Sequence, residues 1–187
     1  IYRLLTLGIP GDHNVENAVV ACAIANEIGI KEDDIRNALA SFKGVKRRFE
    51  YIINRDDCVY IDDYAHHPTE LNAIISSARQ LYPGKKLTGI FQPHLFTRTR
   101  DFLPEFAKSL SQLDKVILME IYPAREQPIE GITSSVLLEH ITTEKAILSG
   151  TEILNDITID KPEVLLTLGA GDIDTLVQPI KEQLQPS

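Results

Sequence analysis

The pattern of apolar and polar positions changes near residue 49 of the chain. Before that point, apolar residues recur every three or four positions, which is the spacing of one face of an α-helix. A first helix is predicted to begin at the capping side chains of residues 12–14 and to end at Gly29, a residue suited to the position after a helix. Its apolar stripe consists of Val15, Ala18, Val19, Cys22, Ala25 and Ile28.

A second helix and a short strand complete this first segment. The helix is predicted to begin at Asp33 or Asp34, and its inward face consists of Ile35, Ala38, Leu39 and Phe42. The strand is predicted over residues 2–7. Because one strand and two helices cannot bury a core by themselves, we interpret residues 1–43 as the end of a preceding domain.

From residue 49 onward, apolar runs typical of strands alternate with stretches of helical spacing. The first two strands are separated only by a short turn, which predicts a hairpin. The strands are predicted at residues 49–54, 58–62, 87–91, 116–119, 146–148 and 164–168. Helices are predicted from Pro68 to about residue 82 and around residues 102–113, 136–140 and 173–184. This alternation predicts an α/β fold with a Rossmann-like, doubly wound, mostly parallel sheet.

The composition narrows the classes of function. The 187 residues are 43% apolar, which is enough for a core, and their formal net charge is −8. Such an acidic chain lacks the basic field of a nucleic-acid binder, and no apolar run is long enough to span a membrane. Cys22 and Cys58 lie in apolar runs without zinc-binding spacing, so we expect two buried thiols in a reducing compartment.

Polar side chains gather after three of the predicted strands, in residues 63–67, 92–100 and 169–172. The carboxyl ends of parallel strands meet at one edge of a sheet, where ligands bind in open α/β folds. Arg98 carries a guanidinium group, which is suited to two-point binding of a carboxylate or phosphate. The Gly-Ala-Gly sequence at 169–171 exposes backbone N–H groups before a predicted helix, a favourable position for an anion. We therefore expect a ligand site here.

Two further groups of polar residues lie outside this edge. Asn14 and Asn17 share a face at the start of the first helix, where their amides either read the edge of a purine or only cap the helix. Four cations lie within residues 43–48. They form either a binding site for a phosphate or a solvated linker. Arg48 differs from the others, because Phe49 beside it begins the next strand and fixes its place at the domain junction.

The chain resembles the Mur ligase family along nearly its whole length. The resemblance rests on residues 11–18 (GDHNVENA), 47–50 (RRFE), 62–70 (DDYAHHPTE), 91–94 (FQPH), 97–101 (TRTRD), 122–124 (YPA) and 169–173 (GAGDI). It implies an ATP-dependent, amide-bond-forming ligase of peptidoglycan synthesis, located in the cytoplasm. Within the family, the motifs are most like those of the members that join L-alanine to UDP-N-acetylmuramate through an acyl phosphate.

The resemblance also implies a domain organisation. Members have a UDP-sugar-binding domain, a central ATPase domain and a C-terminal domain. This chain would cover the end of the central domain (residues 1–43), a hinge linker (44–48) and the C-terminal domain (49–187). The phosphate-binding Gly-Lys-Thr loop and most ligands of the cofactor Mg²⁺ would lie in the missing N-terminal and central domains of the same enzyme.

The resemblance assigns roles to individual residues. For ATP, adenine would be contacted by His13, Asn14 and Asn17, the phosphates by Arg48 and the ribose by Asp63. The incoming amino acid would be held by Tyr64, His66, His94 and Arg98, beside the amides of Gly169, Ala170 and Gly171. His66 and Arg98 are the expected catalytic residues, and no metal ligand is expected. Relatives often have Arg where this chain has Leu95, so one charged contact is missing.

Three alternatives remain open. A murein-recycling ligase joins a whole tripeptide to the same sugar and has similar His-His-Pro loops. A metal-dependent hydrolase would use Asp62, Asp63, His66 and His67 as ligands. A non-catalytic nucleotide-binding module is the third.

Overall fold

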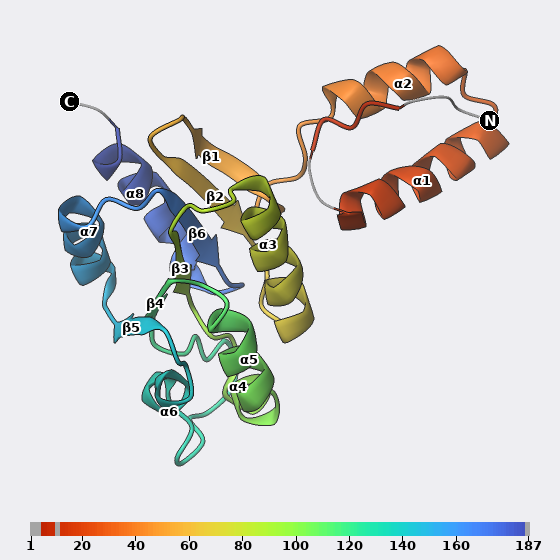
Figure 1. The fold of residues 1–187 in the computed structure, drawn as a ribbon. Helices are drawn as coiled ribbons and strands as arrows, with labels where there is room; N and C mark the ends of the chain where they lie inside the picture. The colour runs from red at the N-terminus through yellow and green to blue at the C-terminus, as the bar shows by residue number, and fades with distance from the viewer. Residues whose placement is uncertain (1–4, 10–11, 186–187) are drawn as a thin grey trace.

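The structure of the protein is a computed structural model that describes residues 5–9 and 12–185. The side chains of Asp12 and His13 lie outside the described part. The described chain forms a six-stranded sheet with helices on both faces, and a pair of helices that stands to one side of it (Figure 1).

The sheet has the strand order β1-β2-β6-β3-β4-β5. Its strands are β1 (Glu50–Asn54), β2 (Val59–Asp63), β3 (Leu87–Phe91), β4 (Lys115–Leu118), β5 (Glu144–Ile147) and β6 (Val164–Leu168). β1 pairs antiparallel with β2, and all other neighbours pair in parallel. The predicted hairpin and mostly parallel sheet are confirmed, although β4 and β5 begin at Lys115 and Glu144 rather than at residues 116 and 146.

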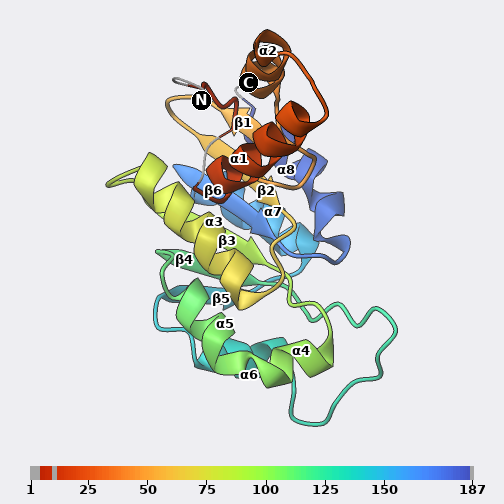
Figure 2. The ribbon, with the colours of Figure 1, turned by 90° about the vertical axis from the view of Figure 1, so that its right-hand side faces the viewer.

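Helices cover both faces of the sheet (Figures 1 and 2). One face packs against α3 (Pro68–Leu81), α5 (Leu103–Leu110) and α6 (Ser134–Glu139). The other packs against α7 (Gly150–Ile159), the 3₁₀ helix η1 (Asp172–Leu176) and α8 (Val177–Gln183). In β2, Val59 and Ile61 enter the first core and Tyr60 enters the second. A strand buried on both faces is typical of a doubly wound fold, which confirms the predicted fold class.

Two helical regions differ from the prediction. Helix α7 was not predicted, although Ser149 and Glu152 form a capping box at its start and Ile153 and Ile157 are buried at helical spacing. The segment expected as the loop 92–100 contains a further helix, α4 (Phe96–Asp101). α4 and α5 are separate helices because the backbone leaves the helical conformation at Phe102, just before the proline in the first turn of α5.

The helix pair consists of α1 (Asp12–Glu27) and α2 (Glu32–Ser41), as predicted. Cys22 and Ile35 are buried between them, but Phe42, expected to face inward, is 44% exposed. Val19 and Ile28 of the expected α1 stripe are also exposed. Within the described residues these two helices cover mainly each other, which leaves much of their apolar surface uncovered. In that part of the chain no helix is both long and apolar enough to cross a membrane.

The strand predicted over residues 2–7 is wrong where it can be checked. Residues 5–7 are not in a strand, and residues 2–4 lie outside the described chain. The backbone bends toward α2 instead, and the Gly8 amide donates to the Leu39 carbonyl at 3.0 Å. A strand requires a neighbouring strand as its hydrogen-bonding partner, and an apolar run alone does not supply one.

The core beside β3 is tightly packed around Gly89. A Cβ atom there would lie 2.4 Å from Cδ1 of Leu113, whose side chain is 1% exposed. Gly89→Ala should therefore lower the free energy of unfolding by about 1–3 kcal/mol. Chemical denaturation measures this effect.

The Leu113→Ala background provides the control. Because the clash is removed there, the same Gly89→Ala change should be neutral or mildly stabilising, since glycine inside a strand costs about 0.5–1 kcal/mol. Equal losses in both backgrounds would show that Leu113 does not constrain Gly89.

Candidate functional site

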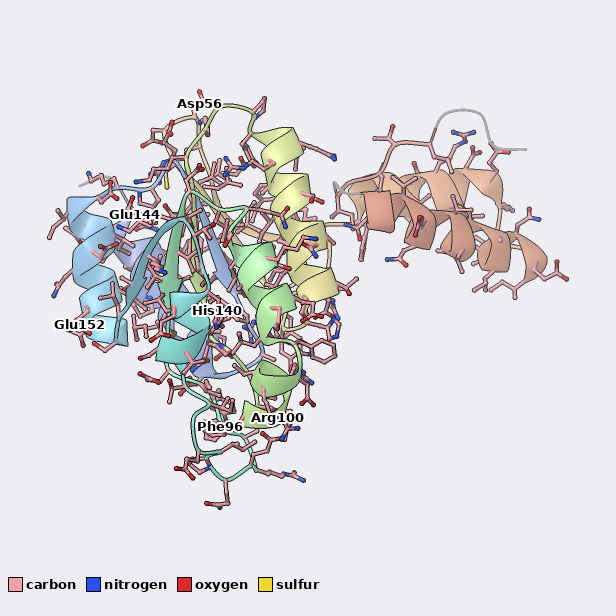
Figure 3. All side chains as sticks on the ribbon, turned by 60° about the horizontal axis from the view of Figure 1, so that its bottom comes forward. Asp56, Phe96, Arg100, His140, Glu144 and Glu152 are labelled. Carbon is pink, nitrogen blue, oxygen red and sulfur yellow. The ribbon has the colours of Figure 1, made fainter. Side chains whose placement is uncertain are left out.

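The three polar loops meet at one edge of the sheet. Asp63 at the end of β2 and Phe91 at the end of β3 are both register partners of Leu168 at the end of β6. Figure 3 shows Phe96 and Arg100 of α4 at one end of the sheet domain and Asp56, in the β1–β2 turn, at the other. The expectation that the loops share an edge is therefore confirmed.

A row of rings runs across this edge. The ring centroids of Tyr64 and His66 lie 5.2 Å apart, and those of His66 and His94 lie 6.2 Å apart. His94 stacks on Tyr122 with 5.6 Å between centroids and 19° between planes. The sequence alone assigned no separate role to Tyr122. Its stacking on His94 depends on an isolated β-bridge between these two residues, which lie in the loops after β3 and β4.

His66 is held by the start of α3. Its backbone N–H donates to Oε2 of Glu70 at 2.9 Å, and Nδ1 lies 2.9 Å from the Tyr64 carbonyl oxygen. A carbonyl only accepts, so this contact selects the tautomer with the hydrogen on Nδ1 and the acceptor position on Nε2. His66 can thus accept a proton from a reacting amine.

Arg98 lies in α4, not in a loop as the sequence suggested. Its Nη1 is 3.5 Å from Nδ1 of His94, which places a cation beside the row of rings. Before the helix, Leu95 has a φ of 75°, a conformation that is unusual for a residue with a branched side chain. The Leu95 amide donates to the Tyr122 carbonyl at 3.0 Å, and this bond helps to hold that backbone conformation.

The pKa of His94 is lowered from its ordinary value. Burial favours the neutral imidazole, and nearby Arg98 and His66 disfavour a positive charge on the ring, although Glu126 acts in the opposite direction. The lowered pKa favours the neutral form of His94, which can accept or donate one hydrogen bond to a ligand.

The glycines of the 169–171 turn are required by packing. A Cβ atom on Gly169 would lie 2.8 Å from the Gln92 carbonyl oxygen, and one on Gly171 would overlap the Gln92 side chain. Gln92 in turn donates to Asp172 at 2.6 Å and accepts from the Ile173 amide at 2.9 Å. The Gly169 amide donates to the Asp63 carbonyl at 3.3 Å, so the amides of Ala170 and Gly171 are the better candidates for an anion site.

A second site lies between the helix pair and α3. It is a cavity of about 780 Å³ with a mostly apolar wall. Its polar lining includes the predicted nucleotide contacts Asn14, Asn17, Arg48 and Asp63. The side chain of His13, the remaining predicted contact, lies outside the described part of the chain. A cavity with an apolar wall, amides and one cation suits a purine nucleotide.

Asp63 forms the wall between the two sites. Its Oδ2 accepts the Phe49 amide at 2.7 Å and its Oδ1 accepts the Ala65 amide at 2.8 Å. Burial raises the pKa of this carboxyl, while the two amides and nearby Arg48 act in the opposite direction. Each carboxylate oxygen has a second acceptor position, so a ligand hydroxyl in the cavity can still bind.

Sequence reasoning missed Arg47. Its side chain reaches back from the linker to Asp62 at the end of β2 and to the Gly169 carbonyl after β6. The adjacent pair Arg47 and Arg48 was a visible signal, but sequence alone could not show that the two side chains have different surroundings.

The described residues do not form a metal site of their own. Among them, no group of three or more His, Cys, Asp or Glu side chains could hold a metal ion. Asp62 is engaged by Arg47, and Asp63 by two backbone amides. The ligand set of the metal-hydrolase alternative is therefore committed to other contacts.

Comparisons with known proteins give one consistent result. The sequence profile described as "Mur ligase, glutamate ligase domain" matches residues 47–171. Two curated relatives are named UDP-N-acetylmuramate–L-alanine ligase. The protein of Flavobacterium johnsoniae is 51% identical over 185 residues, and that of Cytophaga hutchinsonii is 53% identical over 178 residues. The alignments cover 98% and 95% of this chain but only 41% and 38% of the relatives.

The comparison with solved structures agrees with the comparison of sequences. The crystal structure of UDP-N-acetylmuramate–alanine ligase from Thermotoga maritima has a TM-score of 0.81 and 29% identity, and the match covers 97% of this chain and 40% of that one. A murein peptide ligase from Psychrobacter arcticus has a TM-score of 0.67 at 24% identity, which supports the fold alone. The chain thus spans about two fifths of the length of these proteins.

The lowered pKa of His94 can be tested by NMR titration of its imidazole. We expect a pKa below the ordinary value of 6.5. Arg98→Met should raise it, because removing the neighbouring cation relieves the repulsion of the protonated ring.

Arg100→Met is the matched control. Arg100 is on the same helix but pairs with Asp101 and is exposed, so its loss should leave the His94 titration unchanged. If Arg98→Met leaves it unchanged as well, the charge of Arg98 does not reach His94.

Proposed function

The chain belongs to the Mur ligase family, and on this premise we propose that it is the C-terminal part of a UDP-N-acetylmuramate–L-alanine ligase. One observation carries the proposal from fold to function. The short segment from Asp63 to Glu70 borders both sites, since Asp63 and Glu70 line the cavity and Tyr64 and His66 begin the row of rings. A nucleotide in the cavity and an amine at the row would flank the same turn.

The domain organisation follows from this reading. Residues 1–43 would be the end of the central ATP-binding domain, residues 44–48 a linker, and residues 49–187 the C-terminal domain. The uncovered apolar surface of α1, with Val19 64% and Ile24 58% exposed, supports this division. In the whole enzyme, the rest of the central domain would cover that surface.

ATP would occupy the cavity. Asn14 and Asn17, with His13, would contact the adenine, and Asp63 would accept a hydrogen bond from the ribose. Arg48 would pair with a phosphate, for which a guanidinium group offers two parallel donors. Phosphorylation of the UDP-N-acetylmuramate carboxylate by ATP would supply an acyl phosphate for the amine to attack.

The row of rings would hold the amino acid. Arg98 and the amides of Ala170 and Gly171 would bind the L-alanine carboxylate, and Tyr64 and His94 would border its small side chain. His66, with Nε2 as acceptor, would take a proton from the attacking amine. Holding the amine and the acyl phosphate in reacting geometry is worth roughly 7–11 kcal/mol of the barrier.

Mg²⁺ would be held outside this chain. Among the described residues, no group of three His, Cys, Asp or Glu side chains could hold a metal ion, so they do not fit a complete magnesium site. The cytoplasm is the proposed location, in keeping with two free and buried thiols.

The tripeptide-adding murein ligase is the second candidate. It shares the fold at 24% identity, whereas two relatives named as alanine ligases are more than 50% identical. A nucleotide-binding module without catalysis would not need the row of rings with Arg98.

The full-length protein tests this function directly. It should couple L-alanine to UDP-N-acetylmuramate with hydrolysis of one ATP, measured as phosphate release and as product by mass spectrometry. The 187-residue chain alone should fold but show no coupling, because the phosphate loop and the sugar site would be missing. Preference for a tripeptide over L-alanine would favour the second candidate, and coupling by the isolated chain would contradict the domain assignment.

A pair of variants of the full-length protein tests the division into two sites. Arg98→Ala should lower kcat/KM for alanine by roughly 30-fold or more, because losing one partner of a buried charged hydrogen bond costs about 2–5 kcal/mol. Arg98→Lys should restore this only in part, since an ammonium cannot make the planar two-point contact.

Asn17→Ala, in the nucleotide cavity, should show the opposite pattern to Arg98→Ala. It should raise the KM for ATP by about 2- to 12-fold, the equivalent of a lost hydrogen bond of 0.5–1.5 kcal/mol, and leave alanine unaffected. Lower thermal stability with an unchanged KM for ATP would instead mean that Asn17 contributes only to the stability of α1. Equal effects of Arg98→Ala on both substrates would remove Arg98 from the amino-acid site.

A further inference from the structure

Arg47 joins the linker to three parts of the sheet domain. Its Nε is 3.1 Å from Oδ2 of Asp62 in β2, and its Nη2 donates to the Gly169 carbonyl at 2.6 Å. Its Nη1 is 3.7 Å from Oδ2 of Asp174 in η1. A single guanidinium group therefore connects the linker to the ends of β2 and β6 and to the 3₁₀ helix that follows.

The backbone around Arg47 is fixed in an unusual conformation. Arg47 has a φ of 58° and Phe49 a φ of 48°, a region that residues with side chains rarely adopt. The Arg47 amide donates to Oε2 of Glu50 at 2.8 Å, and the Phe49 amide donates to Oδ2 of Asp63. The linker is thus held in one shape, which directs the intervening Arg48 to the cavity.

Arg47 also fixes Tyr64 from two sides. The Tyr64 amide donates to the Arg47 carbonyl at 2.8 Å. The guanidinium carbon of Arg47 lies 5.1 Å from the centroid of the Tyr64 ring, within the range of a cation–π contact. Tyr64 is the first ring of the row, and its carbonyl holds Nδ1 of His66.

A buried hydrogen-bond chain supports the anchor of Arg47. Oδ1 of Asp62 accepts from Oγ1 of Thr167 at 2.6 Å, and Oγ1 of Thr167 lies 3.2 Å from the Tyr60 hydroxyl. The Asp62 side chain is only 2% exposed, so its carboxylate depends on these contacts and on the charge of Arg47. These contacts hold the Asp62 carboxylate, which in turn anchors Arg47.

We propose that Arg47 is a positioning residue for the amino-acid substrate: it sets the Tyr64 ring and the turn at Gly169 when the linker is seated on the sheet domain. This inference rests on the proposed function. The two neighbouring arginines then have separate tasks, because Arg48 lines the nucleotide cavity while Arg47 acts on the row of rings through Tyr64.

Three variants of the full-length protein test this. Arg47→Lys keeps a cation near Asp62 but loses the second contact and the planar group over Tyr64, so the KM for alanine should rise about tenfold or more with the KM for ATP unchanged. Arg48→Lys should show the reverse pattern. Lys46→Ala, an exposed linker cation, should change neither constant.

A double variant separates positioning from stability. Arg47→Met with Asp62→Asn removes the buried charge of Asp62 together with its half-buried partner, so thermal stability should approach that of the wild type. The KM for alanine should nevertheless stay raised, since Tyr64 is still unsupported. If this KM recovers together with stability, or if Arg47→Lys affects both substrates equally, Arg47 is only a structural residue and the inference is wrong.

Hydrogen exchange decides the matter independently of activity. Arg47→Lys should speed exchange of the Tyr64 amide and of the amides of residues 169–171, and Arg48→Lys should not. A wild-type enzyme that does not couple alanine would overturn the proposed function, while the exchange result would still test the link from Arg47 to Tyr64. Unchanged exchange in Arg47→Lys would overturn that link.

Discussion

Parallel pairing holds the ends of β2, β6 and β3 in one row, and the candidate chemistry of the sheet domain depends on it. Asp63, Leu168 and Phe91 are register partners, so the loops that follow them start side by side. A slip of one residue in any of the three strands would move its side chains to the opposite face of the sheet. Burial on both faces fixes the register, because every residue of these strands is buried.

Close packing then limits how the loops leave this row. Gln92 lies against the 169–171 turn, where any Cβ atom at Gly169 or Gly171 would meet it. Gln92 also accepts from the Ile173 amide, which ties the start of η1 to the loop after β3. The turn is therefore a closely packed wall against Gln92 and Tyr122. A site built on such a wall can place a small amino acid without a large rearrangement.

The linker is fixed by polar contacts instead of apolar packing. Asp62 and Asp63 are adjacent on β2, and their side chains point to different partners: Asp62 binds the side chain of Arg47, and Asp63 binds the Phe49 amide. Buried carboxylates are costly unless paired, so these contacts leave the linker few alternative conformations. Nucleotide and amino-acid sites on the two sides of this segment would then be coupled through the linker.

The sequence by itself determined the periodicity of the elements, the hairpin, the doubly wound sheet and the set of loops that carry polar groups, because these follow from local spacing and from the burial of whole strands. The sequence also singled out the glycines of the 169–171 turn, as a binding site for an anion. It did not show that Gln92 packs against them. The tertiary structure alone decided that Arg47 and Arg48 have different surroundings, that Tyr122 stacks on His94, that Arg98 lies in a helix, and that residues 5–7 are not in a strand. Each of these depends on contacts between residues far apart in the chain or on a missing pairing partner, and local sequence carries no record of either.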